Sequence, residues 1–242
     1  MKNIIFLLVT LLCIPFANAG LQEGIDAYKN KDWAIAIPEL EKAASQSSKA
    51  AELLSDYHYS RASWNDETVK WSLMAAKLGD ASLQHKMGVR IDDIAWRQSR
   101  RSHPIENKNF QIAAECFQLA ADQGHAYAQN ALGMMYDMGL KIPQNIKKSI
   151  ELYKASAKQG NSAGLQSLAT MYSSGRGVEK DLLKAYTLFL TSVIHAKAND
   201  DTYDFSNVLA MSLEQQLSKS DVEKAKSMAN SWIPGQPLSG LD

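Results

Sequence analysis

The sequence repeats itself at an interval of 36 residues, and this feature constrains the fold more than any other. Residues 126–160 and 162–196 align at that offset with matched side-chain sizes. The matched pairs include Leu132 with Leu168, Met135 with Met171, Tyr136 with Tyr172, Gly139 with Gly175 and Leu152 with Leu188. The pattern extends backwards to about residue 33, which gives about five units spaced by 32, 45, 36 and 36 residues. Such periodic self-similarity is typical of proteins built from stacked repeats.

Each unit has the pattern of two helices. In one unit, Ile146, Ile150, Tyr153 and Ala157 recur at the three- and four-residue spacing of a single helix face. Asn and Asp, which are good N-caps, occupy equivalent positions before the second helix, at Asn109, Asn145 and Asp181. Glycines suited to a left-handed C-terminal residue follow that helix, at Gly79, Gly124 and Gly160. The sequence therefore predicts an all-α fold, an α/α solenoid of about five helix pairs.

The carboxyl end has the pattern of a capping helix. Residues Ser220-Asp221-Val222-Glu223 match a capping box. An apolar stripe follows that would cover the last repeat, made of Val222, Ala225, Ala229 and Trp232. We expect capping helices over 199–233 and a flexible tail over 234–242.

The first 19 residues read as a secretory signal peptide. Lys2 precedes an apolar run from Ile4 to Phe16, and Ala17-Asn18-Ala19 forms a small-x-small cleavage site. Leu11-Leu12 are too bulky to precede a lipid-modified Cys13, so a lipid anchor is disfavoured. We expect export to the periplasm, with secretion as the alternative, and no membrane span in the mature chain from Gly20.

Composition and motifs give little indication of chemistry. Lys plus Arg and Asp plus Glu both number 26, so electrostatics gives no reason to expect a nucleic-acid partner. Cys116 is the single cysteine of the mature chain, and its repeat equivalents are apolar, which predicts a buried packing residue. The five histidines form no HExxH or Cys/His motif, and no phosphate loop or nucleophile elbow occurs. We therefore expect no catalytic residues, no metal site and no cofactor.

At these residues the chain resembles the Sel1-like repeat family, a relative of the tetratricopeptide repeats. Its first-helix pattern matches Ala128, Leu132, Gly133, Tyr136 and Gly139. Its turn and second-helix pattern matches Tyr172, Gly175, Gly177, Val178, Asp181, Lys184 and Ala185, and its ending matches Ala120, Ala121 and Gly124. The resemblance is best over about 110–196, whereas 20–80 is more like a plain tetratricopeptide repeat.

The resemblance implies a protein-interaction module rather than an enzyme. Similar exported bacterial proteins act as adaptors, regulators, virulence factors or inhibitors of a bound enzyme. A cysteine-rich branch of the family is linked to β-lactam binding, but that branch places a disulfide in each repeat. Because this mature chain has one cysteine, that activity receives little weight.

The third unit is nine residues longer than the 36-residue norm, with the surplus near 89–109. Insertions in solenoids map to loops on one face, often the binding face, and Trp and Arg are enriched at binding hot spots. We therefore expect partner contacts at Trp96, Arg97, Arg100 and Arg101. The alternative is a longer first helix whose arginines are simply solvated. A first helix that runs on through Ile91, Ile94 and Ala95 fits both interpretations.

These observations give one organisation for the chain. The signal peptide covers 1–19, tetratricopeptide-like or degenerate Sel1 repeats cover 20–80, and Sel1-like repeats with the insertion cover 81–198. The function we expect is a periplasmic adaptor or regulator that binds a protein or peptide on a solenoid surface. Two alternatives stay open, an inhibitor or immunity protein against a toxin enzyme, and a hydrolase or binding protein for cell-wall or β-lactam compounds. The sequence does not indicate the oligomeric state.

Overall fold

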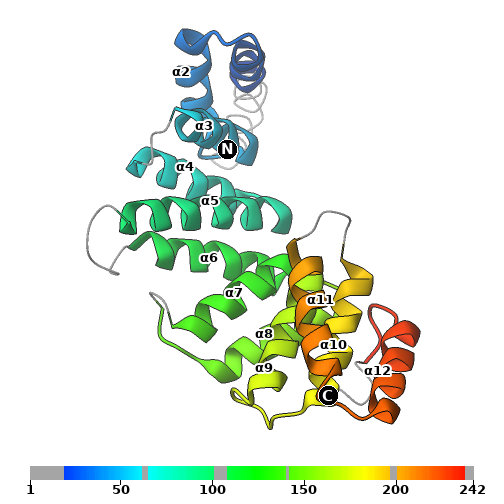
Figure 1. Ribbon diagram of the computed structural model, residues 1–242. Coiled ribbons are helices and arrows are strands. Elements are labelled where there is room, and N and C mark those ends of the chain that lie inside the picture. The colour runs from blue at the N-terminus through cyan, green and yellow to red at the C-terminus, as the bar shows by residue number, and fades with distance from the viewer. Residues whose placement is uncertain (1–18, 62–64, 101–107, 140–141, 197–200, 238–242) are drawn as a thin grey trace, which may run out of the picture. The chain divides into compact units, whose positions relative to one another are not determined.

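The computed structural model describes residues 19–61, 65–100, 108–139, 142–196 and 201–237. Within these ranges the chain forms twelve helices and no strand, which confirms the all-α solenoid (Figure 1). The helices fall into two compact units, Met1–Leu119 and Ala120–Asp242. The signal-peptide prediction lies outside the described residues except for its last position.

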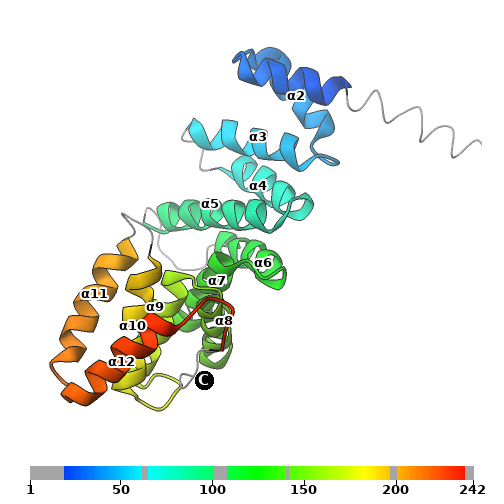
Figure 2. The same cartoon turned by 90° about the vertical axis from the view of Figure 1, so that its right-hand side faces the viewer.

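The first unit is a series of antiparallel helix pairs. It begins with a helix over 19–29, followed by α2 (Trp33–Ala43), α3 (Ser48–Ser60), α4 (Asp66–Leu78), α5 (Ala81–Ser99) and most of α6 (Lys108–Asp122). Helix α3 packs on α2 and on α4, and α4 also packs on α5. Figures 1 and 2 show α4, α5 and α6 lying side by side in chain order. The helices over 19–29, α3 and α5 are the first helices of successive repeats.

The second unit is organised around one central helix. It contains α7 (Ala126–Met138), α8 (Ile146–Lys158), α9 (Ser162–Ser174), α10 (Leu182–His195), α11 (Asp201–Glu214) and α12 (Lys219–Ser231). Helix α10 packs against α9, α11 and α12 (Figure 2). Its residues Tyr186, Leu188 and Phe189 are among the largest fully buried side chains of this unit. Figures 1 and 2 place α12 at the end of the row, as a capping helix.

The repeat is visible in the core as a recurring contact between a ring and a small residue. Phe117, Tyr153 and Phe189 lie 36 residues apart, and each is almost fully buried. A Cβ added at Gly133 would lie 2.7 Å from a ring carbon of Tyr153, and one added at Gly88 would lie 2.7 Å from a ring carbon of Phe117. In these two repeats the first helix has a glycine where the aromatic ring of the second helix packs, so the two helices can approach closely.

The predicted N-caps are right at two positions of three. Asn145 accepts a hydrogen bond from the backbone N–H of Lys148 at 3.0 Å, and Asp181 accepts one from Lys184 at 2.9 Å. Asn109 instead lies inside α6, where it is buried and its Nδ2 donates to Gln98 Oε1 at 2.8 Å. The longer first helix of this repeat brings Gln98 to that position, so Asn109 joins α5 to α6.

The predicted left-handed glycines are also right at two positions of three. Gly124 and Gly160 have φ values of +82° and +78°. Gly79 is extended, with φ −93° and ψ 172°, so that prediction is wrong. Asp80 caps α5 directly after Gly79, which leaves no residue for a left-handed turn. A side chain is excluded there for another reason, because a Cβ would lie 2.7 Å from Leu83 Cδ2.

The carboxyl end differs from its prediction in two details. The cap of α12 is Ser218, whose Oγ accepts from the backbone N–H of Asp221 at 3.1 Å, rather than a box beginning at Ser220. The stripe of Val222, Ala225 and Ala229 is buried as expected. The expected flexible tail is held at its start, because the backbone N–H of Gly235 donates to Lys158 O at 2.7 Å.

Candidate functional site

The first helices of the first unit are joined by polar contacts at a repeat interval. Lys86 Nζ donates to Glu52 Oε1 at 2.7 Å, and Arg90 pairs with Asp56. Tyr59 donates from its hydroxyl to Asp93 Oδ2 at 2.8 Å. Each pair joins residues 34 positions apart on α3 and α5. We call the face formed by the helix over 19–29, α3 and α5 the first-helix surface.

Asp93 is one of the carboxylates of this surface that accept two side-chain hydrogen bonds. It accepts from the Tyr59 hydroxyl and, at 2.6 Å, from Arg97 Nε. Burial on its own raises the pKa of Asp93, but the hydrogen bonds from Arg97 and Tyr59 outweigh it, and the pKa is lowered. The pKa of Tyr59 is raised by burial and then by the Asp93 charge. Asp93 is therefore ionised at neutral pH and holds Arg97 in place.

Three of the four residues expected at the partner site lie at the end of α5, and Arg101 lies outside the described residues. Trp96 is 40% exposed and packs edge-on against Phe110 at 5.6 Å between ring centroids. Arg97 is paired with Asp93, and Arg100 follows the last residue of α5, with its backbone N–H donating to Trp96 O at 3.2 Å. The 19-residue α5 runs on through buried Ile91 and Ile94. Trp96 and Arg97 are thus brought together on the last turns of a rigid helix.

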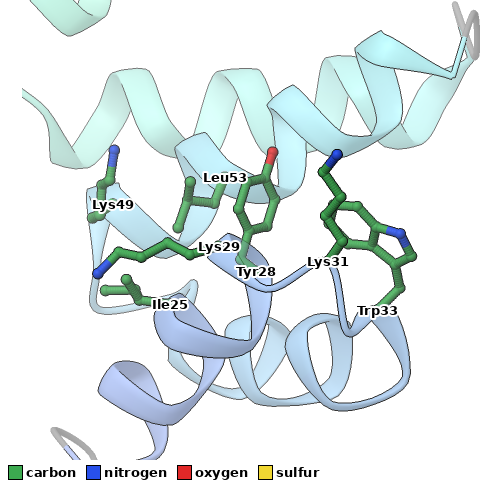
Figure 3. Close-up of a pocket in the computed structure, with 7 residues that line it drawn as sticks. All are labelled: Ile25, Tyr28, Lys29, Lys31, Trp33, Lys49 and Leu53. Carbon is green, nitrogen blue, oxygen red and sulfur yellow. The ribbon is translucent and has the colours of Figure 1, made fainter.

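A hollow at the start of the first-helix surface was missed by sequence reasoning. It has a volume of about 440 Å³ and is lined by Ile25, Tyr28, Lys29, Lys31, Trp33, Lys49 and Leu53 (Figure 3). In Figure 3, Tyr28 and Leu53 lie between Lys29 and Lys49 on one side and Lys31 and Trp33 on the other. The signal that the sequence offered was a pair of aromatic residues, Tyr28 and Trp33, five positions apart with lysines around them.

Aromatic rings continue from the hollow along α3. Tyr28 lies edge-on to Trp33 at 5.3 Å, and Trp33 lies 5.0 Å from Tyr57. The guanidinium carbon of Arg61 is 4.5 Å from the centre of the Tyr57 ring, a cation–π distance. Burial raises the pKa of Tyr28, and the nearby Asp56 charge adds to the shift. The hollow therefore borders the polar ladder that joins α3 to α5.

The second unit has a similar polar ladder on its own first helices. Ser167 Oγ donates to Asn130 Oδ1 at 2.9 Å between α9 and α7. Arg176 lies 3.1 Å from Asp137 Oδ1 across the same pair of repeats. Large apolar side chains are exposed on α7 and α11, namely Tyr127, Met134, Met138, Tyr203, Phe205, Val208 and Met211.

The remaining candidate residues lie in positions typical of structural roles. Cys116 is fully buried, as expected from its apolar equivalents, and burial raises the pKa of its thiol to about 12. In the described ranges, no three His, Cys, Asp or Glu side chains come close enough together to hold a metal ion. Over the same residues, no helix combines the length and apolar character needed to cross a membrane. His125 caps α7, with Nδ1 accepting from the Ala128 N–H at 3.3 Å.

Paired helices, a buried ring at each repeat and ladders between first helices define an α/α repeat protein. A sequence model of the Sel1 repeat matches residues 65–80, 105–125, 126–161 and 163–192. These four segments are therefore Sel1 repeats, which confirms the resemblance drawn from the repeat residues. A comparison with curated proteins found no match.

Solved structures show the same fold. The crystal structure of c5321, described as a protective antigen of uropathogenic Escherichia coli strains with an SLR fold, matches with a TM-score of 0.65 and 21% identity. That match covers 93% of this chain and 47% of the antigen, so the chain spans about half of the antigen's length. A Sel1 repeat protein from Oxalobacter formigenes matches with a TM-score of 0.50 and 23% identity, covering 73% of this chain and 71% of the other.

Proposed function

We propose that this Sel1-repeat protein is a non-enzymatic binding module that holds a protein or peptide partner on the first-helix surface. Sel1 repeats are generally protein–protein interaction modules, which supports the class. The observation that carries the proposal is the gathering of aromatic and arginine side chains on three successive first helices. Tyr28, Tyr57 with Arg61 at the end of α3, and Trp96 with Arg97 recur along that surface. These are the residue types that dominate binding energy at protein interfaces.

We also propose that the protein is exported and acts in the periplasm as an adaptor or regulator. Its support is the signal-peptide pattern of residues 1–19. An inhibitor of a toxin enzyme would use the same surface, and the identity of the captured partner would distinguish it. The hydrolase alternative has no metal site to support it among the described residues, where no three His, Cys, Asp or Glu side chains lie close enough together to hold an ion.

The test is capture of a partner by purified mature protein from periplasmic extract, with variants of the surface. Trp96→Ala combined with Arg97→Gln removes an exposed ring and a cation from α5. The matched control combines Ile35→Ala with Lys70→Gln on the second helices α2 and α4. Ile35 is 44% exposed, close to the 40% of Trp96, and Lys70 is an exposed cation paired with Glu67.

We expect the wild-type chain and the control to retain a stoichiometric partner and the surface variant to lose it. Because Trp96 also packs on Phe110, Trp96→Phe with Arg97→Gln is a second variant that keeps a ring there. Far-ultraviolet circular dichroism would confirm that each variant is folded. Equal capture by all variants, or turnover of a substrate that depends on one polar side chain, would overturn the proposal.

A further inference from the structure

The hollow beside Tyr28 and Trp33 combines apolar walls with a positively charged rim. Ile25 and Leu53 provide aliphatic surface, and Tyr28 and Trp33 provide rings. Lys29, Lys31 and Lys49 line the same hollow (Figure 3). A volume of about 440 Å³ is within the range of small-molecule sites and exceeds one aromatic side chain.

Two of the three lysines are already neutralised within the chain. Lys29 Nζ lies 3.1 Å from Asp26, and Lys49 Nζ lies 2.9 Å from Glu52, which Lys86 also contacts. Among the described residues, no carboxylate lies within ion-pair distance of Lys31. Lys31 is exposed, so its ammonium is available to a charge from outside the chain.

The backbone conformation of Lys31 is also unusual, independently of its charge. Its φ is +61°, and in the described ranges it is the one residue other than glycine with positive φ. The N–H of Lys31 donates to Tyr28 O and that of Asp32 donates to Ala27 O, which is the Schellman ending of a helix. Turns with the same hydrogen-bond pattern follow α6 and α8, and there this chain places Gly124 and Gly160. Lysine in this conformation is disfavoured relative to glycine because its Cβ crowds the backbone.

A strained residue that persists beside a hollow suggests that its side chain has a function there. We propose that the hollow binds an acidic peptide segment of the partner, which places an aromatic side chain in the hollow against Tyr28 and pairs a carboxylate with Lys31. This inference rests on the proposed function and names the chemistry that the first repeat recognises. The apolar walls select the ring, and Lys31 selects an acidic residue beside it.

The first test compares stability with binding in the same variant. Lys31→Gly should raise the melting temperature of the mature chain by about 3 °C, because it relieves the left-handed backbone. It should weaken binding of an acetylated and amidated EDFED peptide by about threefold to fivefold, the loss of one exposed ion pair. Titration followed by the Trp33 indole N–H resonance, assigned with a Trp33→Phe variant, reports binding at the hollow itself.

Further variants separate charge from backbone shape. Lys31→Asn, which tolerates the left-handed region, should lose the same affinity, and Lys31→Arg should retain it. Lys70→Gln on α4 removes a lysine away from the hollow and should leave affinity unchanged. Peptides with the phenylalanine replaced by alanine, or with the acidic residues replaced by lysine, should bind more weakly than EDFED.

The inference is overturned if Lys31→Gly is no more stable than the wild type, or if it binds EDFED as well as the wild type does. Equal binding of the acidic and the lysine-substituted peptide also overturns it. These outcomes are distinct from failure of the proposed function. A partner that is captured through Trp96 and Arg97, but is indifferent to Lys31, would leave the binding module intact and remove this pocket from its mechanism.

Discussion

The contact between Gly133 and Tyr153 predicts a specific sensitivity to one methyl group. A Cβ at Gly133 would lie 2.7 and 2.8 Å from two ring carbons of Tyr153 and 3.3 Å from Ser149 O. These distances are shorter than van der Waals contact, and Tyr153 is almost fully buried. The ring cannot swing into solvent, so Gly133→Ala must push α7 and α8 apart.

The expected change in the free energy of unfolding is the difference between two opposing effects. Overpacking a core by one methyl group costs about 1–3 kcal/mol, and replacing glycine by alanine within a helix returns about 1 kcal/mol. We expect Gly133→Ala to lower the free energy of unfolding by about 1 kcal/mol and the melting temperature by about 4 °C. Thermal unfolding followed by circular dichroism would measure both values.

The chain contains its own control for this prediction. Ala169 is the 36-residue equivalent of Gly133, is fully buried, and lies in the same core cluster as Phe189. Ala169→Gly should therefore destabilise the protein by about 1 kcal/mol through lost helix propensity. A Gly133→Ala variant that is as stable as the wild type, or more stable, would refute the close-approach argument.

Three further predictions follow from the contacts described above. Cys116 should not react with a maleimide in the native protein, because its thiol is buried with a pKa of about 12; labelling as fast as in urea would contradict its burial. Asn145→Ala should lower the free energy of unfolding in urea by about 1 kcal/mol through loss of the α8 cap, and Asn145→Asp should not. Asp93→Asn should destabilise the protein near pH 7, because a carboxylate with a lowered pKa stabilises the fold above its unfolded pKa. That difference should shrink as the pH falls below the ordinary pKa of an aspartate and through the lowered pKa of Asp93, and a melting-temperature difference that stays constant with falling pH would argue against it.

The architecture was predictable from the sequence because repetition amplifies weak local signals. A single Leu-Gly pair or a single Asn cap is ambiguous, but recurrence at 36 residues identifies the helix pair and its ends. The predictions that were wrong lie where one repeat departs from its neighbours. Gly79 is extended because the next helix begins directly after it, and Asn109 lies inside α6 because α5 is longer than the other first helices.

The candidate site was less predictable because it depends on contacts between repeats. Trp96 and Arg97 stood out as unusual residues in an insertion, but their partners Phe110 and Asp93 depend on how α5 packs. The hollow at Tyr28 and Trp33 forms from the helix over 19–29, the turn that leads into α2, and α3. Nothing in the local sequence indicates that Lys31 adopts a left-handed conformation, since that position is usually glycine.

The central claim, that the first-helix surface of this Sel1-repeat protein holds a partner, is tested most directly by crosslinking in the cell. A photoreactive amino acid would replace Trp96 on the first-helix surface or, as the matched control, Ile35 on α2. We expect a discrete crosslinked protein from position 96 and none from position 35. No adduct from position 96, or the same adduct from both positions, would contradict it.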